Sequence, residues 1–136
     1  MSFVLDSSVA LAWLLPDERS EAVDPLLDRL AVGRVSVPCH WPLEVGNALI
    51  SAVRNKRLAG NDLRRLLKHA AAFPVDIDSG DVDIAFNGVV QLAARHGLTT
   101  YDAAYVELAQ RNRCPLATLD TRLATACKAA GVAVLP

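Results

Sequence analysis

The sequence predicts an α/β fold: a three-layer α/β/α sandwich with a central, mainly parallel sheet. Short apolar runs of strand length alternate with longer segments of helical periodicity, and strands separated by helices pair in parallel. Hydrophobic residues make up 52% of the 136 residues and aromatic residues only 5%, so the core must be built from Ala, Val and Leu. These small side chains suit helices packed closely on a sheet. We expect one domain over residues 1–136, because a chain of this length supports a single core.

Five apolar runs predict the strands. Phe3, Val4 and Leu5 are consecutive apolar residues, as in a strand that is buried on both faces. Pro38 closes the second run, and Pro74 is tolerated near the start of a third, edge strand. The predicted strands are Phe3–Asp6, Val35–Val37, Phe73–Ile77, Pro115–Leu119 and Val132–Leu135.

The segments between these runs predict seven helices. The first stops before Pro16, and the second carries Leu26 and Leu30 on one face. Gly97 and Gly131 follow the fifth and the last helix, at the position that glycine favours after a helix. The predicted helices are Val9–Leu15, Glu21–Leu30, Pro42–Arg57, Gly60–Ala72, Gly80–His96, Tyr101–Asn112 and Thr121–Ala130.

Charge and hydropathy exclude some classes of protein. The formal net charge is −1, so the molecule as a whole lacks the basic character of a nucleic-acid binder and any site for a polyanion must be local. No uncharged run reaches the roughly 18 residues that a membrane-spanning helix needs. The N-terminus lacks the basic region of a secretory signal and carries Asp6 early. We therefore expect no membrane association and a cytoplasmic location.

Four carboxylates, those of Asp6, Glu44, Asp102 and Asp120, have apolar or small neighbours. Each follows a predicted strand or lies in the first turn of a predicted helix, and in a parallel sheet these places share the edge where ligands bind. Each acid also has a purely structural explanation. Asp6 and Asp120 suit helix N-caps, Asp102 suits a capping box with Thr99, and Glu44 complements a helix dipole. Caps tolerate Ser, Thr or Asn, yet all four positions carry a carboxylate, which favours a shared site.

Four anions at one place repel each other and raise each other's pKa values, and a hard divalent cation removes that penalty. Mg²⁺, with Mn²⁺ as the alternative, prefers oxygen ligands and keeps several waters. Such a site suits phosphodiester hydrolysis, because the metal polarises the phosphoryl oxygen and supplies an activated water. The sequence has no Walker-type loop, nucleophile elbow or His-based triad that would indicate another chemistry.

Four motifs resemble the PIN-domain family of metal-dependent ribonucleases, and specifically the VapC-like toxins of bacterial toxin–antitoxin pairs. They are VLDSSV from Val4, WPLEVGNAL from Trp41, LTTYDAAYVELA from Leu98 and LATLDTRL from Leu116. They occur in the family's order and span essentially the whole chain. One departure is Gly46, where the family often has a larger residue.

The resemblance implies a PIN-like fold and endonucleolytic cleavage of RNA that depends on Mg²⁺ and leaves a 5′-phosphate and a 3′-hydroxyl. It also implies a homodimer, and an antitoxin that covers or enters the acidic cleft. The site residues that it implies are Asp6 and Asp102 as principal metal ligands, Glu44 and Asp120 as further acids acting directly or through water, and Ser7 and Thr118 as polar support.

An acidic site needs basic neighbours to hold RNA, because phosphate contacts supply most of the non-specific affinity. The one dense basic cluster contains Arg54, Lys56 and Arg57, which would form a rim for the RNA backbone. A solvated turn between two helices is the alternative explanation of this cluster.

Two other functions stay open. A non-catalytic PIN-like scaffold that binds RNA or protein predicts the loss of one or more of the four acids, and all four are present. A Mg²⁺-dependent phosphatase is disfavoured, because Ser8 stands where such enzymes place a second Asp after the first strand. No Lys directly follows the second or fourth predicted strand either.

Overall fold

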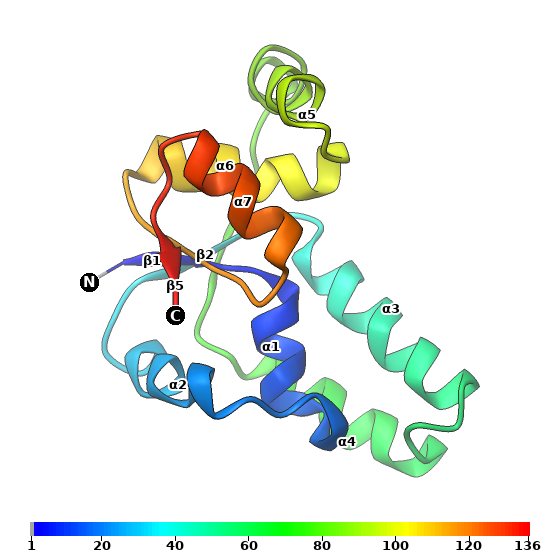
Figure 1. Ribbon diagram of the computed structural model, residues 1–136. Helices are drawn as coiled ribbons and strands as arrows, with labels where there is room; N and C mark the ends of the chain where they lie inside the picture. Colours follow the sequence, from blue (N-terminus) through cyan, green and yellow to red (C-terminus); the bar gives the residue numbers. More distant parts are fainter. Residues whose placement is uncertain (1) are drawn as a thin grey trace.

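A five-stranded parallel sheet forms the centre of the computed structural model, and helices lie on both sides of it (Figure 1). The strand order is β3-β2-β1-β4-β5, and every neighbouring pair is parallel. The structure describes residues 2–136, so Met1, the first residue of the predicted domain, lies outside the described residues. The predicted α/β architecture with a central parallel sheet is confirmed.

The elements alternate along the chain as the sequence predicts. The strands are β1 (Phe3–Leu5), β2 (Val35–Pro38), β3 (Asp76–Asp78), β4 (Leu116–Ala117) and β5 (Val134–Leu135). The α-helices are α1 (Ser7–Leu14), α2 (Asp24–Leu30), α3 (Trp41–Arg54), α4 (Gly60–Ala71), α5 (Val90–His96), α6 (Thr100–Asn112) and α7 (Thr121–Ala129). Shorter helical segments are η1 (Pro16–Glu18), η2 (Glu21–Val23) and η3 (Ile84–Val89). Among residues 2–136, no helix combines the length and the apolar character that crossing a membrane requires.

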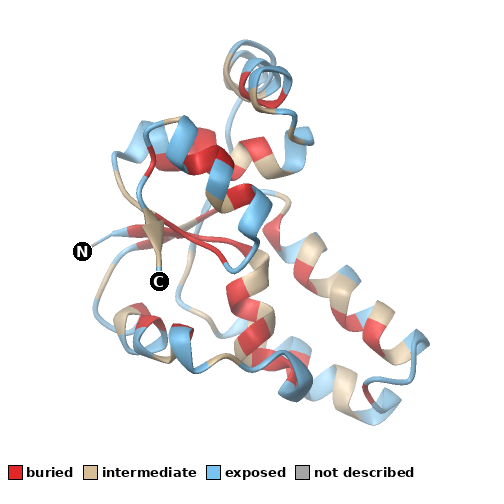
Figure 2. Ribbon diagram, in the orientation of Figure 1, coloured by how far each residue is buried: buried red, intermediate tan, exposed pale blue. Residues whose placement is uncertain are grey.

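The central strand β1 explains why the sequence begins with an apolar run. Phe3, Val4 and Leu5 have no exposed surface, because β2 and β4 flank the strand and α6 packs across all three strands. The buried residues follow this arrangement, with β1 and the inner sides of α1 and α6 coloured as buried in Figure 2. A strand covered on both faces must be apolar at every position.

The third strand is shifted from its predicted position. The ladder with β2 runs over Asp76–Asp78 rather than Phe73–Ile77, and β3 is an edge strand. Phe73 and Val75 pack against the core before the ladder begins, and the N–H of Val75 donates to the carbonyl of Phe73 in a tight turn at 2.8 Å. The prediction followed the apolar side chains, which here precede the paired backbone.

The predicted helix Gly80–His96 contains a π-helical segment, η3, before α5 begins. The carboxylate of Asp81 accepts a hydrogen bond from the N–H of Ile84 at 2.8 Å and caps the helical region, which begins at Val82, two residues after Gly80. The helix ends at Gly97, whose φ of +64° requires the left-handed conformation that glycine adopts without strain. In Figure 1 this region projects from the body of the molecule.

Candidate active site

The candidate site lies at the carboxyl ends of the neighbouring strands β1 and β4, where the order of the strands in the sheet reverses. From β1 the chain builds outward to β2 and β3, and later returns to place β4 on the other side of β1. Crevices at such switch points are the usual ligand sites of α/β proteins. Asp6 follows β1, Asp120 lies just after β4, and Glu44 and Asp102 lie in the first turns of α3 and α6.

All four predicted acids line one hollow of about 500 Å³ at this edge. We call this the acidic hollow and define it by Asp6, Glu44, Asp102 and Asp120. The other lining residues are Ser7, Ser8, Leu11, Glu18 and Leu119. Residues that are far apart in the sequence are therefore brought to one place by the parallel sheet.

Asp6 is the most buried of the four acids, with 5% of its surface exposed. It occupies the N-cap position of α1, yet its side chain makes no capping hydrogen bond, so capping does not account for this carboxylate. Instead its Oδ2 accepts hydrogen bonds from the hydroxyls of Ser8, at 2.6 Å, and Thr118, at 2.7 Å. Burial raises the pKa of Asp6; the two hydroxyls oppose this effect, and the charges of Glu44 and Asp102 add to it.

The two hydroxyls that bind Asp6 are themselves held by the backbone after β4. The Ser8 hydroxyl accepts a hydrogen bond from the N–H of Leu119, and the Thr118 hydroxyl accepts one from the N–H of Asp120, both at 3.0 Å. Each hydroxyl proton is thereby directed toward the carboxylate. The resemblance implied Ser7 and Thr118 as support; Ser7 lines the hollow, but Ser8 is the serine that donates to Asp6.

Glu44 is held by two residues that the sequence analysis did not assign. The Tyr105 hydroxyl donates to its Oε1 at 2.5 Å, and Nε2 of His40 lies 3.4 Å from the same oxygen. Burial raises the pKa of Glu44, but the contacts with His40 and Tyr105 outweigh it and bring the pKa below its usual value. Helical spacing could have indicated both residues, because Tyr105 lies three residues after Asp102 and His40 four residues before Glu44.

The pKa of Asp102 is raised above its usual value. Burial raises its pKa, the charges of Glu44 and Asp120 raise it further, and the charge of Arg122 opposes them. The N–H of Asp102 donates to the hydroxyl of Thr99 at 3.1 Å, so Thr99 caps α6 as the sequence predicts.

Asp120 has both a structural role and a place in the hollow. Its Oδ1 accepts hydrogen bonds from the N–H groups of Arg122, at 2.9 Å, and Leu123, at 3.2 Å, and so caps α7. The capping explanation is thus correct for one oxygen of this residue. Among the hydrogen bonds of residues 2–136, none ends on its Oδ2.

The sequence matches known proteins over most of its length. Residues 3–129 match the family model of the PIN domain. The chain belongs to the PIN domain family. It is 30% identical over 125 residues to Ribonuclease VapC3 of Pyrobaculum aerophilum, a match that covers 91% of this chain and 93% of the relative. The predicted resemblance to VapC-like PIN proteins is confirmed.

Solved structures share the PIN fold of this chain. PAE2754 from Pyrobaculum aerophilum superimposes with a TM-score of 0.72 at 24% identity, over 98% of this chain and 83% of that one. VapBC2 from Rickettsia felis, bound to a DNA fragment from their promoter, gives a TM-score of 0.67 at 10% identity, over 98% and 97% of the two chains.

The donor set of this PIN domain fits a hard cation. The hollow presents carboxylate and hydroxyl oxygens, the ligands that Mg²⁺ prefers. Asp6 is buried, and no positive charge contributes to its pKa. Within residues 2–136, no three Asp, Glu, His or Cys side chains lie close enough together to hold a metal ion as they stand. The carboxylates therefore line the hollow but would have to move closer together to bind one ion.

The three residues of the predicted basic rim differ in the structure: Arg57 is paired with acids, and Arg54 and Lys56 are exposed. Arg57 donates hydrogen bonds to Asp17, at 2.8 and 3.2 Å, and to Glu18, at 2.8 Å, so its charge is balanced by two acids. Arg54 and Lys56 are exposed at the end of α3 and in the following turn. Because Glu18 lines the acidic hollow, Arg57 connects this turn to the edge of the hollow.

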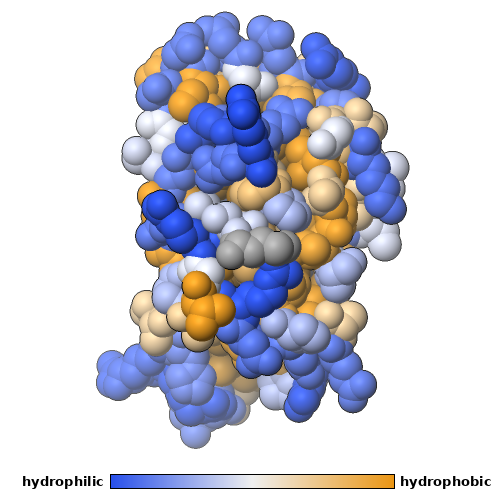
Figure 3. Space-filling model, turned by 90° about the vertical axis from the view of Figure 1, so that its left-hand side faces the viewer, coloured by the Kyte–Doolittle hydropathy of each residue, from blue (hydrophilic) through white to orange (hydrophobic). Residues whose placement is uncertain are grey.

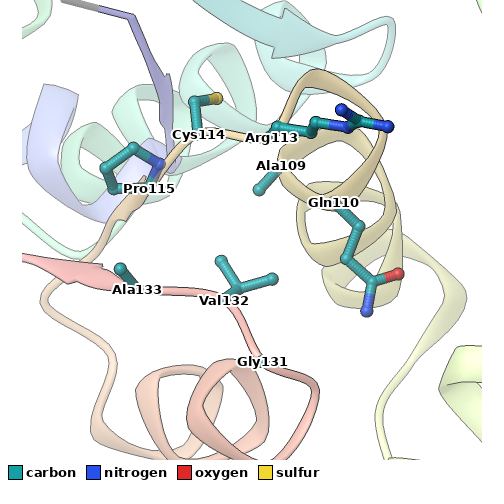
Figure 4. Close-up of a pocket in the computed structure, with 8 residues that line it drawn as sticks. All are labelled: Ala109, Gln110, Arg113, Cys114, Pro115, Gly131, Val132 and Ala133. Carbon is teal, nitrogen blue, oxygen red and sulfur yellow. The ribbon is translucent and has the colours of Figure 1, made fainter.

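A second hollow, of about 400 Å³, lies between the end of α6 and the segment before β5 (Figure 4). Its lining includes Cys114, Val132 and Ala133, and the guanidinium of Arg113 points away from them. No carboxylate lines it, so it lacks the chemistry of the acidic hollow. Figure 3 shows the face that lies on the left in Figure 1, where hydrophilic residues cover most of the surface and apolar residues lie between them.

Proposed function

We propose that this PIN domain protein is a Mg²⁺-dependent endoribonuclease that hydrolyses RNA phosphodiester bonds at the acidic hollow and acts as the toxin of a toxin–antitoxin pair. The observation that carries this proposal is the placement of four carboxylates from four separate segments around one hollow, in which the buried Asp6 has no cationic partner. Similarity to a relative named Ribonuclease VapC3 supports the RNA-cleaving activity.

In this proposal Asp6 and Asp102 are the principal metal ligands, and Glu44 and Asp120 act directly or through bound water. When bound, Mg²⁺ supplies positive charge that polarises a phosphoryl oxygen and lowers the pKa of a bound water. Thr118 and Ser8 hold the Asp6 carboxylate in one orientation.

In this proposal Glu44 would accept the proton of the attacking water. Glu44 uses Oε1 to accept the Tyr105 hydroxyl, and its Oε2 can accept the proton of the attacking water. The departing 3′ oxygen would take a proton from solvent, so cleavage would leave a 5′-phosphate and a 3′-hydroxyl.

For RNA contact we propose Arg54 and Lys56, whose exposed side chains can reach a phosphate backbone without breaking an ion pair of the described structure. Arg57 would contribute less attraction for RNA, because Asp17 and Glu18 already neutralise it. Its role in this proposal is to hold the turn beside the hollow.

The decisive experiment is cleavage of an end-labelled structured RNA by the purified protein, in Mg²⁺ and in EDTA, beside Asp102→Asn. Asp28→Asn is the matched control, because Asp28 is exposed on α2, outside the hollow. We expect cutting by the wild type and the control in Mg²⁺ only, and none by Asp102→Asn. Cutting that persists in EDTA or in Asp102→Asn would refute the metal site.

The same proteins distinguish the enzyme from a non-catalytic scaffold. A nuclease should gain thermal stability from Mg²⁺ and cut RNA, with both effects reduced in Asp102→Asn. Stabilisation by Mg²⁺ without cleavage of any RNA tested would favour the scaffold.

We also propose a homodimer, a protein antitoxin and a cytoplasmic location. The solved VapBC2 complex supports a second, antitoxin chain as partner. Val82 lies just before η3, Phe86 lies on η3 and Val90 begins α5. These residues recur every four positions with 71%, 68% and 39% of their surfaces exposed, an apolar stripe that suits association. Light scattering after gel filtration should give a dimeric mass for the wild type and a monomeric mass for Phe86→Glu.

A further inference from the structure

We infer that Tyr105 is a positioning residue for Glu44, an inference that rests on the proposed function and deepens it. The Tyr105 hydroxyl donates to Oε1 of Glu44 at 2.5 Å, across 61 residues of sequence. Tyr105 has no exposed surface, so it lies behind Glu44 and not in the path of a substrate. It acts on the reaction only through the carboxylate that it holds.

The Tyr105 ring is well suited to hold another side chain still. It belongs to α6, which packs across β1, β2 and β4, and its ring meets that of His40 edge-to-face, with ring centroids 5.4 Å apart. Two side-chain torsions set the position of the hydroxyl, and close packing fixes both. The donor therefore stands at a defined point at the edge of the hollow.

Glu44, in contrast, has little else to restrain it. It lies in the first turn of α3, has a side-chain exposure of 32%, and turns about three side-chain torsions. His40 Nε2 approaches the same Oε1 at 3.4 Å but makes no hydrogen bond within residues 2–136. The hydrogen bond from the Tyr105 hydroxyl therefore holds Glu44 in one rotamer. It uses Oε1, so Oε2 stays available to a metal ion or a water in the hollow.

The test compares Tyr105→Phe with Tyr101→Phe. Both substitutions remove one hydroxyl from α6, and both rings contact His40, that of Tyr101 at 5.5 Å. Tyr101 is 63% exposed, and its hydroxyl makes no hydrogen bond in the described part of the chain, which makes it the matched control. For Tyr105→Phe we expect kcat for RNA cleavage to fall about tenfold with KM changed less than about twofold; Tyr101→Phe should match the wild type.

A second readout does not depend on RNA cleavage. The Mg²⁺ concentration that gives half-maximal thermal stabilisation should rise several-fold in Tyr105→Phe. The same substitution in a Glu44→Gln background should leave this midpoint unchanged, because the carboxylate that Tyr105 positions is then absent. A purely structural role would lower the melting temperature in both backgrounds and leave both midpoints unchanged.

The outcomes separate the two proposals. If the wild type cuts RNA and Tyr105→Phe matches Tyr101→Phe in kcat and in Mg²⁺ midpoint, the positioning role is refuted and the nuclease stands. If no RNA is cut but the midpoint shifts only when Glu44 is present, the nuclease proposal fails and Tyr105 still positions Glu44 toward a metal. A wild type that neither cuts RNA nor gains stability from Mg²⁺ refutes both.

Discussion

The Thr118 hydroxyl donates to Oδ2 of Asp6 at 2.7 Å and so joins two residues that lie 112 positions apart. The same hydroxyl accepts the N–H of Asp120 at 3.0 Å. One small polar side chain therefore connects two of the four acids and fixes the end of β4 against the end of β1.

Replacing Thr118 by Val keeps the shape of the side chain and removes both hydrogen bonds. We expect the free energy of unfolding to fall by about 1–3 kcal/mol, because a buried carboxylate loses a donor and a backbone N–H loses its acceptor. Urea denaturation measures the change. Thr125→Val is the control, since its hydroxyl bonds only to the Thr121 carbonyl on the exposed face of α7. Equal losses in the two variants would contradict the prediction.

The raised pKa of Asp6 makes the stability of the metal-free protein depend on pH. The folded state favours the neutral carboxyl, so the stabilisation is complete below the ordinary value of 3.8 and is lost as the pH rises through the raised value. In EDTA, the melting temperature of the wild type should therefore fall relative to Asp6→Asn as the pH rises above about 4. Asp102 titrates in both proteins, so their difference reports Asp6. A difference that does not vary with pH would contradict this shift.

Arg111, on α6, joins this helix to the end of β3 through an ion pair with Asp78. Its guanidinium donates to both oxygens of Asp78, at 3.0 and 2.8 Å, and its Nε donates to Oε1 of the buried Glu107 at 2.6 Å. Arg111→Met should lower the free energy of unfolding by about 1–3 kcal/mol, because Glu107 is left without its cation.

The control for Arg111→Met is Arg65→Met, which breaks an exposed pair with Asp62 and should cost less than about 0.5 kcal/mol. Urea denaturation of both variants gives the comparison. Adding Glu107→Gln to Arg111→Met should restore part of the loss, because the uncompensated buried charge is then removed. A double variant less stable than Arg111→Met would argue against charge burial as the cause.

Gly46 lies inside α3 with room for a side chain, since a Cβ built there meets no atom within 4 Å. Gly46→Ala should therefore stabilise the protein by about 0.5–1 kcal/mol, because alanine restricts the unfolded chain and favours the helix. Gly97→Ala should have the opposite effect, because φ is +64° there. Thermal unfolding of both variants checks the two signs, and destabilisation by Gly46→Ala would show that α3 is packed more tightly than its contacts indicate.

Much of the fold was predictable because a parallel sheet leaves a strong pattern. β1 is apolar at every position, and Gly97 ends α5 by backbone geometry. The start of β3 was not predictable, since Phe73 and Val75 are apolar for packing rather than for pairing. The π-helical turn of η3 was also hidden, because one wide turn barely changes the spacing of apolar residues.

The four acids of the candidate site were predictable because they are charged residues among apolar neighbours. The neutral Ser8 and Tyr105, which hydrogen-bond to these acids, were not predicted. Carboxylates are visible in a sequence because burying them is costly. The choice between Ser7 and Ser8 depends on the residue at which α1 begins, which sequence periodicity places only within two residues. Helical spacing places Tyr105 on the side of α6 that carries Asp102, but its hydrogen bond to Glu44, 61 residues away in the sequence, is visible only in the structure.

The pairing of β1 with β4 means that the site can form only after most of the chain has been synthesised. A ribosome produces β1 first, but the backbone N–H of Asp6 bonds to the carbonyl of Ala117, and its carboxylate bonds to Thr118. A nascent chain that has not reached Leu116 has neither partner. Under the proposed function, a chain that ends before Leu116 should therefore not cleave RNA, because Asp6 lacks the partners that hold it at the hollow.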